Sequence, residues 1–281
     1  MMLRRFSQLD VFTTTPTLGN ALAVVHDADG LSEAEMAAFA RWTNLSETTF
    51  LLQPTDEQAD YRVRIFTPGG ELPFAGHPTL GSCYAWLAAG GLAKKPGQVV
   101  QQCGVGLVRV KRDGARLAFA APPLRRSGPA DASLRPQVST VLGLPDADLL
   151  ALEWVDNGPG WLAVQLASAQ AVLQITPNFA ALQGLNLGVV GAYAAGSECQ
   201  FEVRAFVPEL GVPEDPVTGS LNAGLAQWLI GSGQAPEQYL VSQGTCMGRQ
   251  GRVYVQAEGP DIWIGGHIAA CISGTVILGN H

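Results

Sequence analysis

Short runs in which apolar and polar residues alternate recur throughout the first half of the chain, and each predicts a β-strand. The first two runs, 8–13 and 21–26, are separated by a turn at Gly19 and Asn20 and are expected to pair. A helix is expected over 32–42, because Ser32 and Glu35 have the spacing of a capping box. Further strands are expected at 48–53, 61–66, 99–103, 107–111 and 117–121.

The second half of the chain follows a similar plan. Helices are expected at 134–142 and 179–185. Strands are expected at 149–156, 161–166, 201–207, 237–241, 252–257, 262–266 and 269–278. The stretch 122–132, which lies between the two halves, is rich in Pro, Arg and Gly and is expected to be a linker.

An internal repeat relates the two halves. Four residues recur at one constant spacing: Arg64, Phe66, Pro68 and Pro73 match Arg204, Phe206, Pro208 and Pro213. Four more follow at a spacing two residues shorter: His77, Pro78, Gly81 and Ser82 match Asp215, Pro216, Gly219 and Ser220. So many matches in one short window predict that the chain arose by duplication.

Each half also contains a helix that lacks a polar stripe, at 79–89 and at 218–230. A helix that is apolar on all sides is buried on all sides. Neither helix is long enough to span a bilayer, which takes about 20 residues. A curved sheet wrapped around one central helix, built twice, satisfies this pattern. The sequence therefore predicts an α+β fold with two pseudo-symmetric lobes.

Composition excludes several classes of function. Of the 281 residues, 47% are hydrophobic, so each half can bury a core, and the formal net charge of −7 argues against nucleic-acid binding. No apolar run is long enough for a membrane span. The five cysteines form no Cys-x-x-Cys pair and have no His at metal spacing, which favours reduced thiols in the cytoplasm and no metal site.

One polar residue precedes the Pro-x-x-Gly-Ser segment in each half, and these two residues are the first candidates for chemistry. They are His77 and Asp215. A helix N-terminus offers unpaired N–H groups and a positive dipole end to a carboxylate. Two different side chains on related halves could then serve as proton donor and acceptor. Taken singly, each has an ordinary explanation: a hydrogen-bonded loop histidine and a helix-capping aspartate.

Longer segments carry a resemblance to a known family. They are LDVFT at 9–13, GN at 19–20 followed by AVV at 23–25, NLSETTF at 44–50, FTP at 66–68, ELPFAGHPTLG at 71–81 and EDPVTGS at 214–220. Together they resemble the motif set of the PhzF-like phenazine-biosynthesis isomerases, in order, from about residue 8 to the C-terminus.

The resemblance implies the diaminopimelate epimerase-like fold. Two lobes, each a barrel-like sheet around a central helix, are then expected at 1–121 plus 269–281 and at 133–268, with a catalytic cleft between them. It also implies that Glu47 is the catalytic acid and base, assisted by His77 and Asp215. The substrate carboxylate is expected at the residues Gly76, Gly81, Gly219 and Ser220. The implied reaction is a cofactor-free isomerisation of a small carboxylate, and the family is commonly a homodimer.

Two other functions compete with the isomerase. Related amino-acid epimerases use two cysteines at the helix starts, and this sequence has no thiol at 75–77 or 215–217. A noncatalytic protein that keeps the site for binding carboxylates is disfavoured, because Glu47, His77 and Asp215 are all present. Val217, Leu221 and Asn222 differ from the phenazine enzymes beside the second motif, so the physiological substrate stays open.

Overall fold

The computed structural model describes residues 2–208 and 212–279 and divides into two compact units. Unit 1 comprises Met1–Ala120 and Gly265–His281, and unit 2 comprises Ala121–Ile264. The segment 122–132, expected to be a linker, contains strand β9 (Arg126–Pro129), which pairs with β10 (Ala151–Asp156). Residues 126–129 therefore belong to the sheet of unit 2, and the whole segment belongs to that unit.

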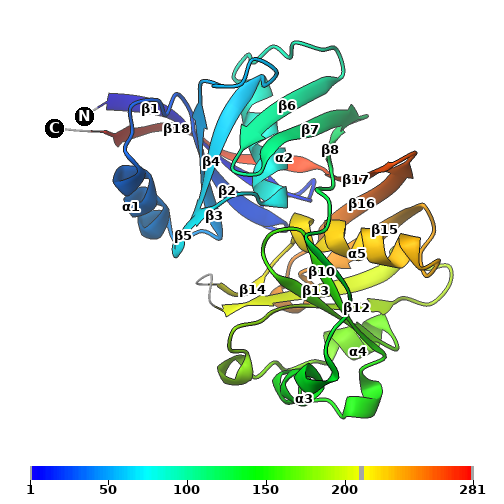
Figure 1. Cartoon of the computed structure of the whole chain (residues 1–281). Coiled ribbons are helices and arrows are strands. Elements are labelled where there is room, and N and C mark those ends of the chain that lie inside the picture. Colours follow the sequence, from blue (N-terminus) through cyan, green and yellow to red (C-terminus); the bar gives the residue numbers. More distant parts are fainter. Residues whose placement is uncertain (1, 209–211, 280–281) are drawn as a thin grey trace. The chain divides into compact units, whose positions relative to one another are not determined.

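The described residues of unit 1 form one sheet with the α-helices α1 (Glu33–Thr43) and α2 (Gly76–Ala88), whose arrangement can be followed in Figure 1. The strands of unit 1 are β1 (Met2–Val11), β2 (Asn20–Val25), β3 (Glu47–Leu52), β4 (Tyr61–Thr67), β5 (Gly70–Leu72), β6 (Gln98–Cys103), β7 (Gly106–Asp113), β8 (Arg116–Ala120) and β18 (Ile268–Leu278). Strand β18 pairs antiparallel with β1, so the end of the chain completes the first sheet.

The described residues of unit 2 form the strands β9 to β17, three α-helices and several short 3-10 turns. Its further strands are β11 (Trp161–Leu166), β12 (Asn186–Ala192), β13 (Phe201–Val207), β14 (Val212–Asp215), β15 (Gln238–Gln243), β16 (Gly251–Glu258) and β17 (Asp261–Gly266). Its helices are α3 (Arg135–Leu142), α4 (Ala169–Leu173) and α5 (Gly219–Gly231). Where a helix was expected at 179–185, only a 3-10 turn at Phe179–Ala181 forms.

The two units share one pattern of strand pairing. In unit 1 the pairs β1–β2, β3–β4 and β6–β7 are antiparallel, and the pairs β2–β3 and β4–β6 are parallel. In unit 2 the corresponding pairs β10–β11, β12–β13 and β15–β16 are antiparallel, and β11–β12 and β13–β15 are parallel, so β1, β2, β3, β4, β6 and β7 correspond in turn to β10, β11, β12, β13, β15 and β16. A short hairpin strand, β5 or β14, and then a central helix, α2 or α5, follow the fourth of these strands in each unit. The predicted duplication is confirmed by this topology.

The central helices lie close against their sheets because each has a glycine in its second turn. An added Cβ at Gly81 of α2 would lie 2.4 Å from Cδ2 of Leu22, and one at Gly224 of α5 would lie 2.2 Å from the carbonyl oxygen of Val155. Most residues in the first two turns of both helices are fully buried. The predicted apolar helices are therefore the inner layer of each unit.

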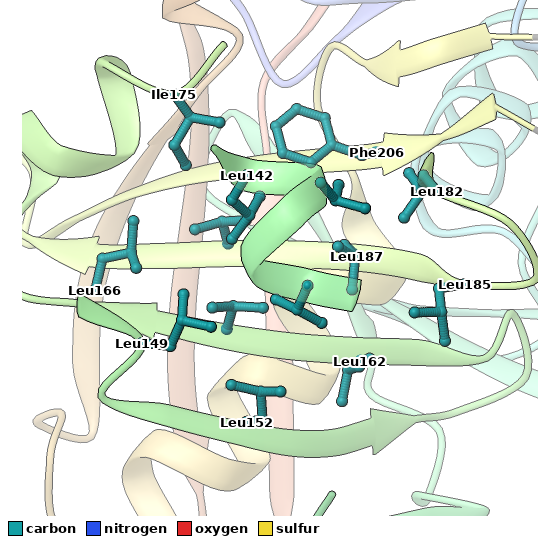
Figure 2. Close-up of a cluster of buried hydrophobic side chains, with 14 of the residues drawn as sticks. Leu142, Leu149, Leu152, Leu162, Leu166, Ile175, Leu182, Leu185, Leu187 and Phe206 are labelled. Carbon is teal, nitrogen blue, oxygen red and sulfur yellow. The ribbon is translucent and has the colours of Figure 1, made fainter. Parts of the chain in front are cut away.

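A second hydrophobic core covers the other face of each sheet. In unit 2 it joins Leu142 of α3 to Leu162, Leu187 and Phe206 of the strands (Figure 2). In unit 1, α1 supplies the corresponding core, which includes Phe39. The capping box predicted at the start of α1 is present: Ser32 and Glu35 each bond the other's backbone N–H.

Candidate active site

The hairpin before each central helix carries the same ion pair in both units. Arg64 Nε donates to Glu71 at 2.7 Å, and its guanidinium lies 5.1 Å from the ring centre of Phe66. In unit 2 the Nε of Arg204 donates to Glu214 at 2.8 Å, and its guanidinium lies 5.0 Å from the ring centre of Phe206. Glu71 pairs with Phe66 across the strands just as Glu214 pairs with Phe206. These residues are therefore structural counterparts.

This correspondence corrects the second part of the sequence repeat. Counting from Glu71 and Glu214, a segment without gaps matches Glu71, Pro73, Gly76 and Gly81 to Glu214, Pro216, Gly219 and Gly224. Both central helices begin at the third of these matches. The structural counterpart of His77 is therefore Ser220, and that of Asp215 is Leu72. The expected match between His77 and Asp215 is wrong, because the hairpin of unit 2 is longer than that of unit 1.

Glu47 and His77 lie together in unit 1, as the sequence led us to expect. Glu47 is the first residue of β3, and His77 is the second residue of α2. Their closest atoms, Oε2 of Glu47 and Nε2 of His77, are 3.4 Å apart. The exposed fractions of the two residues are only 8% and 2%. Catalytic hydrogen bonds are often this long before substrate binds and tighten afterwards.

Burial keeps the imidazole of His77 neutral. Desolvation lowers the pKa of His77 to about 3, against a smaller opposing effect of the backbone at Ala21. The Nδ2 of Asn20 lies 3.1 Å from Nδ1 of the ring. Because an amide nitrogen can only donate, Nδ1 accepts this hydrogen bond and the single ring proton is on Nε2. The ring therefore directs an N–H toward the Glu47 carboxyl group.

The first turns of both central helices lack side-chain caps. Neither N-cap residue, Ala75 for α2 or Thr218 for α5, accepts a hydrogen bond from the helix with its side chain. Such a helix start suits an anion. Gly76 and Gly219 are the first residues of the two helices, whereas Gly81 lies in the second turn and makes close packing possible there.

Asp215 lies in a polar cluster of unit 2. It is the last residue of β14 and is 9% exposed. The hydroxyl of Thr218 donates to its Oδ2 at 2.6 Å. Nearby, Ser220 accepts a hydrogen bond on its hydroxyl oxygen from the Nε1 of Trp161 at 3.0 Å. The Nδ2 of Asn157 donates to the carbonyl of Ser220 at 2.8 Å.

Several of these partners were missed in the sequence. Asn20 was assigned to a turn, although it is the first residue of β2 and contacts His77. Trp161 lies in no motif, and Thr218 was noted only as part of EDPVTGS. The gapless match that begins at Glu71 and Glu214 was the available signal for aligning the two helix starts correctly.

The thiols are not arranged for catalysis at the helix starts. Burial raises the pKa of Cys83, in the third turn of α2, to about 12, and it also raises the pKa of Cys103. No set of three or more His, Cys, Asp or Glu side chains among residues 2–208 and 212–279 is grouped to bind a metal ion. Within the same residues, every helix is too short or too polar to cross a membrane.

Comparisons with known proteins agree with the fold and identify the family. The family model described as "Phenazine biosynthesis-like protein" matches residues 9–274. The chain is 38% identical to "Antisense-enhancing sequence 1" of Schizosaccharomyces pombe, over 96% of this chain and 97% of that protein. It is 35% identical to the trans-2,3-dihydro-3-hydroxyanthranilate isomerase of Pseudomonas aeruginosa, over 92% and 91%.

A crystal structure of a phenazine biosynthesis protein of the PhzF family from Enterococcus faecalis has a TM-score of 0.80 at 26% identity, covering 99% of this chain and 100% of that one. This neighbour confirms the two-lobed α+β fold expected from the sequence. The matches extend over nearly the whole chain. The chain therefore belongs to the phenazine biosynthesis-like protein family, as a PhzF-like isomerase.

Proposed function

We propose that this isomerase moves a proton within a small carboxylate-bearing substrate by general acid and base catalysis, without a cofactor, and that Glu47 carries the proton. The observation that supports this most directly is the buried approach of Glu47 to His77 at the start of α2. A carboxylate that is largely removed from water is a stronger base than an exposed one. It can take a proton from one carbon and return it to another while the double bond shifts.

His77 is proposed to assist Glu47 as a neutral hydrogen-bond donor. Its Nε2 has no hydrogen-bond partner among the residues that the structure describes. A neutral N–H can hold the Glu47 carboxylate, or an oxygen of the substrate, without taking up the proton itself, because the pKa of His77 is about 3. In this proposal Glu47 carries the transferred proton, whereas His77 keeps its own proton and only donates a hydrogen bond.

Substrate binding is proposed to involve the starts of both central helices. A substrate carboxylate would be bound by the backbone at Gly76, and Asp215, Gly219 and Ser220 would contact other polar groups of the same molecule. The support for this step is the duplication, which gives both units a helix start without a side-chain cap. Ser220 stands where unit 1 has His77, so the two units offer different chemistry at equivalent positions.

A deuterium-exchange experiment tests the proposed reaction. The protein is incubated in D₂O with trans-2,3-dihydro-3-hydroxyanthranilate, the substrate in the names of several relatives, and with a panel of cyclic and open-chain carboxylates. We expect an isomerised product that carries deuterium at carbon for at least one of them. Binding by a thermal shift without exchange in any compound would instead support a noncatalytic carboxylate-binding protein.

Alkylation separates this mechanism from that of a two-thiol epimerase. Because Glu47 and His77 would perform the chemistry, iodoacetamide should leave the exchange rate largely unchanged. Of the five free cysteines, Cys83 and Cys199 are buried and Cys246 and Cys271 are exposed. Loss of most of the activity on alkylation would contradict the carboxylate mechanism.

A homodimer is part of the proposal. Leu3 and Ile277 are directly paired across β1 and β18 and are 66% and 59% exposed. Met2 and Ile272 add further exposed apolar side chains to the same two strands. Light scattering after gel filtration should give twice the chain mass of 29.5 kDa, and the double variant Leu3→Asp, Ile277→Asp should give a monomer. A monomeric native protein would exclude the dimer.

The compartment is proposed to be the cytoplasm. All five cysteines are free, and free thiols persist in reducing compartments. Fractionation of cells that produce the full-length protein should recover it with cytoplasmic markers. Recovery from an oxidising compartment would contradict this.

A further inference from the structure

The side chain of Gln243, at the end of β15, connects the segment around Asp215 to helix α5. Gln243 is fully buried. Its Oε1 accepts hydrogen bonds from the backbone N–H of Thr218 at 3.0 Å and from Nδ2 of Asn222 at 2.9 Å. Its Nε2 donates to the hydroxyl of Thr218 at 2.9 Å and to the carbonyl of Asp215 at 3.2 Å. A backbone N–H can only donate and a carbonyl can only accept, so the orientation of this amide is determined.

The orientation of Gln243 determines the direction of the next hydrogen bond. The oxygen of the Thr218 hydroxyl accepts from Gln243, so the single hydroxyl hydrogen is available to a different partner. That partner is Oδ2 of Asp215, 2.6 Å away. Asp215 is therefore the acceptor, and a short hydrogen bond donated to a carboxylate favours its ionised form.

Charged side chains on the elements beside Asp215 include the Arg204–Glu214 pair and Arg249. Glu214, the residue before Asp215, is engaged by both Nε and Nη2 of Arg204 on the adjacent strand, at 2.8 Å each. A Cβ added at Gly244 would lie 2.7 Å from the carbonyl oxygen of Pro216 and 2.8 Å from Cβ of Arg249, so Arg249 lies close to the segment that follows Asp215. These groups lie on β13, on β14 and on the segment after β15.

Unit 1 contains a similar glutamine–threonine contact, built from residues at other positions than in unit 2. There the Nε2 of Gln101, on β6, donates to the hydroxyl of Thr79 at 2.9 Å. Thr79 in turn donates to the carbonyl oxygen of Ala75 at 2.9 Å. A glutamine on the strand after the central helix thus orients a threonine hydroxyl in both units, and in unit 2 alone the threonine hydroxyl reaches a carboxylate.

We propose that Gln243 and Thr218 are positioning residues that hold Asp215 as an ionised, oriented hydrogen-bond acceptor during the reaction. This rests on the proposed function, in which Asp215 contacts the substrate. Asp215 then acts as a fixed negative charge or acceptor for a substrate N–H or O–H group, and the transferred proton stays with Glu47. The substrate must accordingly carry a hydrogen-bond donor, such as an amino or hydroxyl group, as well as its carboxylate.

The test is a titration that does not need the natural substrate. The protein is labelled with ¹³C at the aspartate carboxyl carbons, and the Asp215 signal is assigned by its absence in Asp215→Asn. In Thr218→Val, which removes the hydroxyl at nearly constant volume, the titration midpoint of Asp215 should rise by about one pH unit or more. Thr218→Ser should restore most of the native midpoint. Thr79→Val is the matched control in unit 1 and should leave the Asp215 midpoint unchanged.

Activity on a substrate found by deuterium exchange gives the second readout. Thr218→Val should lower kcat by about 10- to 100-fold and Thr218→Ser by much less, measured well below the melting temperature of each variant. A native Asp215 midpoint and a native kcat in Thr218→Val, together with an inactive Asp215→Asn, would overturn the positioning role and leave the proposed function intact. A fully active Asp215→Asn would overturn both, because Asp215 would then have no part in the reaction.

Discussion

The two units have the same topology and the same helix start, but they place different side chains beside it. Unit 1 places Glu47 and His77 beside the first turn of α2, whereas unit 2 has Ser220 at the position of His77 and Asn186 as the first residue of the strand that corresponds to β3. The ion pair of the hairpin is kept at equivalent positions in both, whereas the glutamine–threonine contacts involve different positions of the two helix starts. Duplication therefore preserved the elements that shape the helix start, and the two sites diverged in the side chains that face it.

The largest expected effect is the loss of activity on removal of the Glu47 carboxylate, in whose place unit 2 has Asn186. Glu47→Gln keeps the size of the side chain but removes its ability to accept and return a proton, so kcat should fall by about 10³-fold. The exchange assay in D₂O measures this, and the melting temperature should stay close to native. Glu57→Gln, an exposed glutamate of the same unit, is the control and should retain full activity. A Glu47→Gln variant with substantial exchange would remove Glu47 from the mechanism.

The hairpin ion pairs should differ in their contribution to stability, although they look alike. The side chains of Arg204 and Glu214 are 4% and 12% exposed, whereas those of Arg64 and Glu71 are 23% and 35% exposed. Glu214→Gln leaves a buried guanidinium without its charge partner and should lower the free energy of unfolding by about 3 kcal/mol. Glu71→Gln should cost less than about 1 kcal/mol, also because Arg64 keeps Glu33. Urea unfolding measures both losses of stability. Equal losses would mean that burial does not decide how much each ion pair contributes.

The helix glycines should also respond unequally to a methyl group. In Gly224→Ala the new Cβ meets the backbone carbonyl of Val155, which cannot move without shifting β10, so we expect a loss of about 2 kcal/mol. In Gly81→Ala it meets the end of the Leu22 side chain, which can rotate away, and alanine is the better helix former. We therefore expect a change within about 1 kcal/mol for Gly81→Ala. Thermal unfolding of the two variants side by side decides this, and a larger loss in Gly81→Ala would show that Leu22 is as immobile as the backbone.

The smallest expected effect is on the pH dependence of the free energy of unfolding. His77 contributes to this dependence in unit 1, whereas Ser220, at the equivalent position of unit 2, has no group that titrates in this range. Burial lowers the pKa of His77 from 6.5 to about 3, so between these values the unfolded chain binds a proton that the folded chain does not. The free energy of unfolding should therefore fall as the pH drops below 6.5, by roughly 1.5 kcal/mol between pH 6.5 and 5 from this residue. His77→Asn should remove that part of the slope, while His26 and His267 contribute equally to both proteins.

The measurement compares urea unfolding of the native protein and His77→Asn at pH 6.5 and 5. Identical slopes would mean that His77 is protonated in the folded protein, against its burial. Protonation of His77 would also place a positive charge beside Glu47, and activity should then be lost between pH 6.5 and 5.

Secondary structure was predictable wherever a local pattern decided it. The capping box at Ser32 and Glu35 marked the start of α1, and the uncharged runs marked both central helices. Prediction failed at 179–185 and at β12, where the sequence Asn-Leu-Gly-Val-Val-Gly-Ala has two glycines and no alternation. Strand β12 forms because its neighbours β11 and β13 pair with it on both sides.

The sequence by itself determined that the chain is a duplication built around two apolar helices, and its motifs identified the family and named Glu47, His77 and Asp215 as candidates. These properties depend on periodicity and on short segments, which are local in the chain. Only the tertiary structure decided that His77 corresponds to Ser220, and that Asn20 and Gln243 set the direction of the hydrogen bonds at the two sites. Asn20 and His77 are 57 residues apart, and Gln243 and Thr218 are 25 apart. Contacts of this kind are made by packing of sheet against helix, which no local pattern encodes.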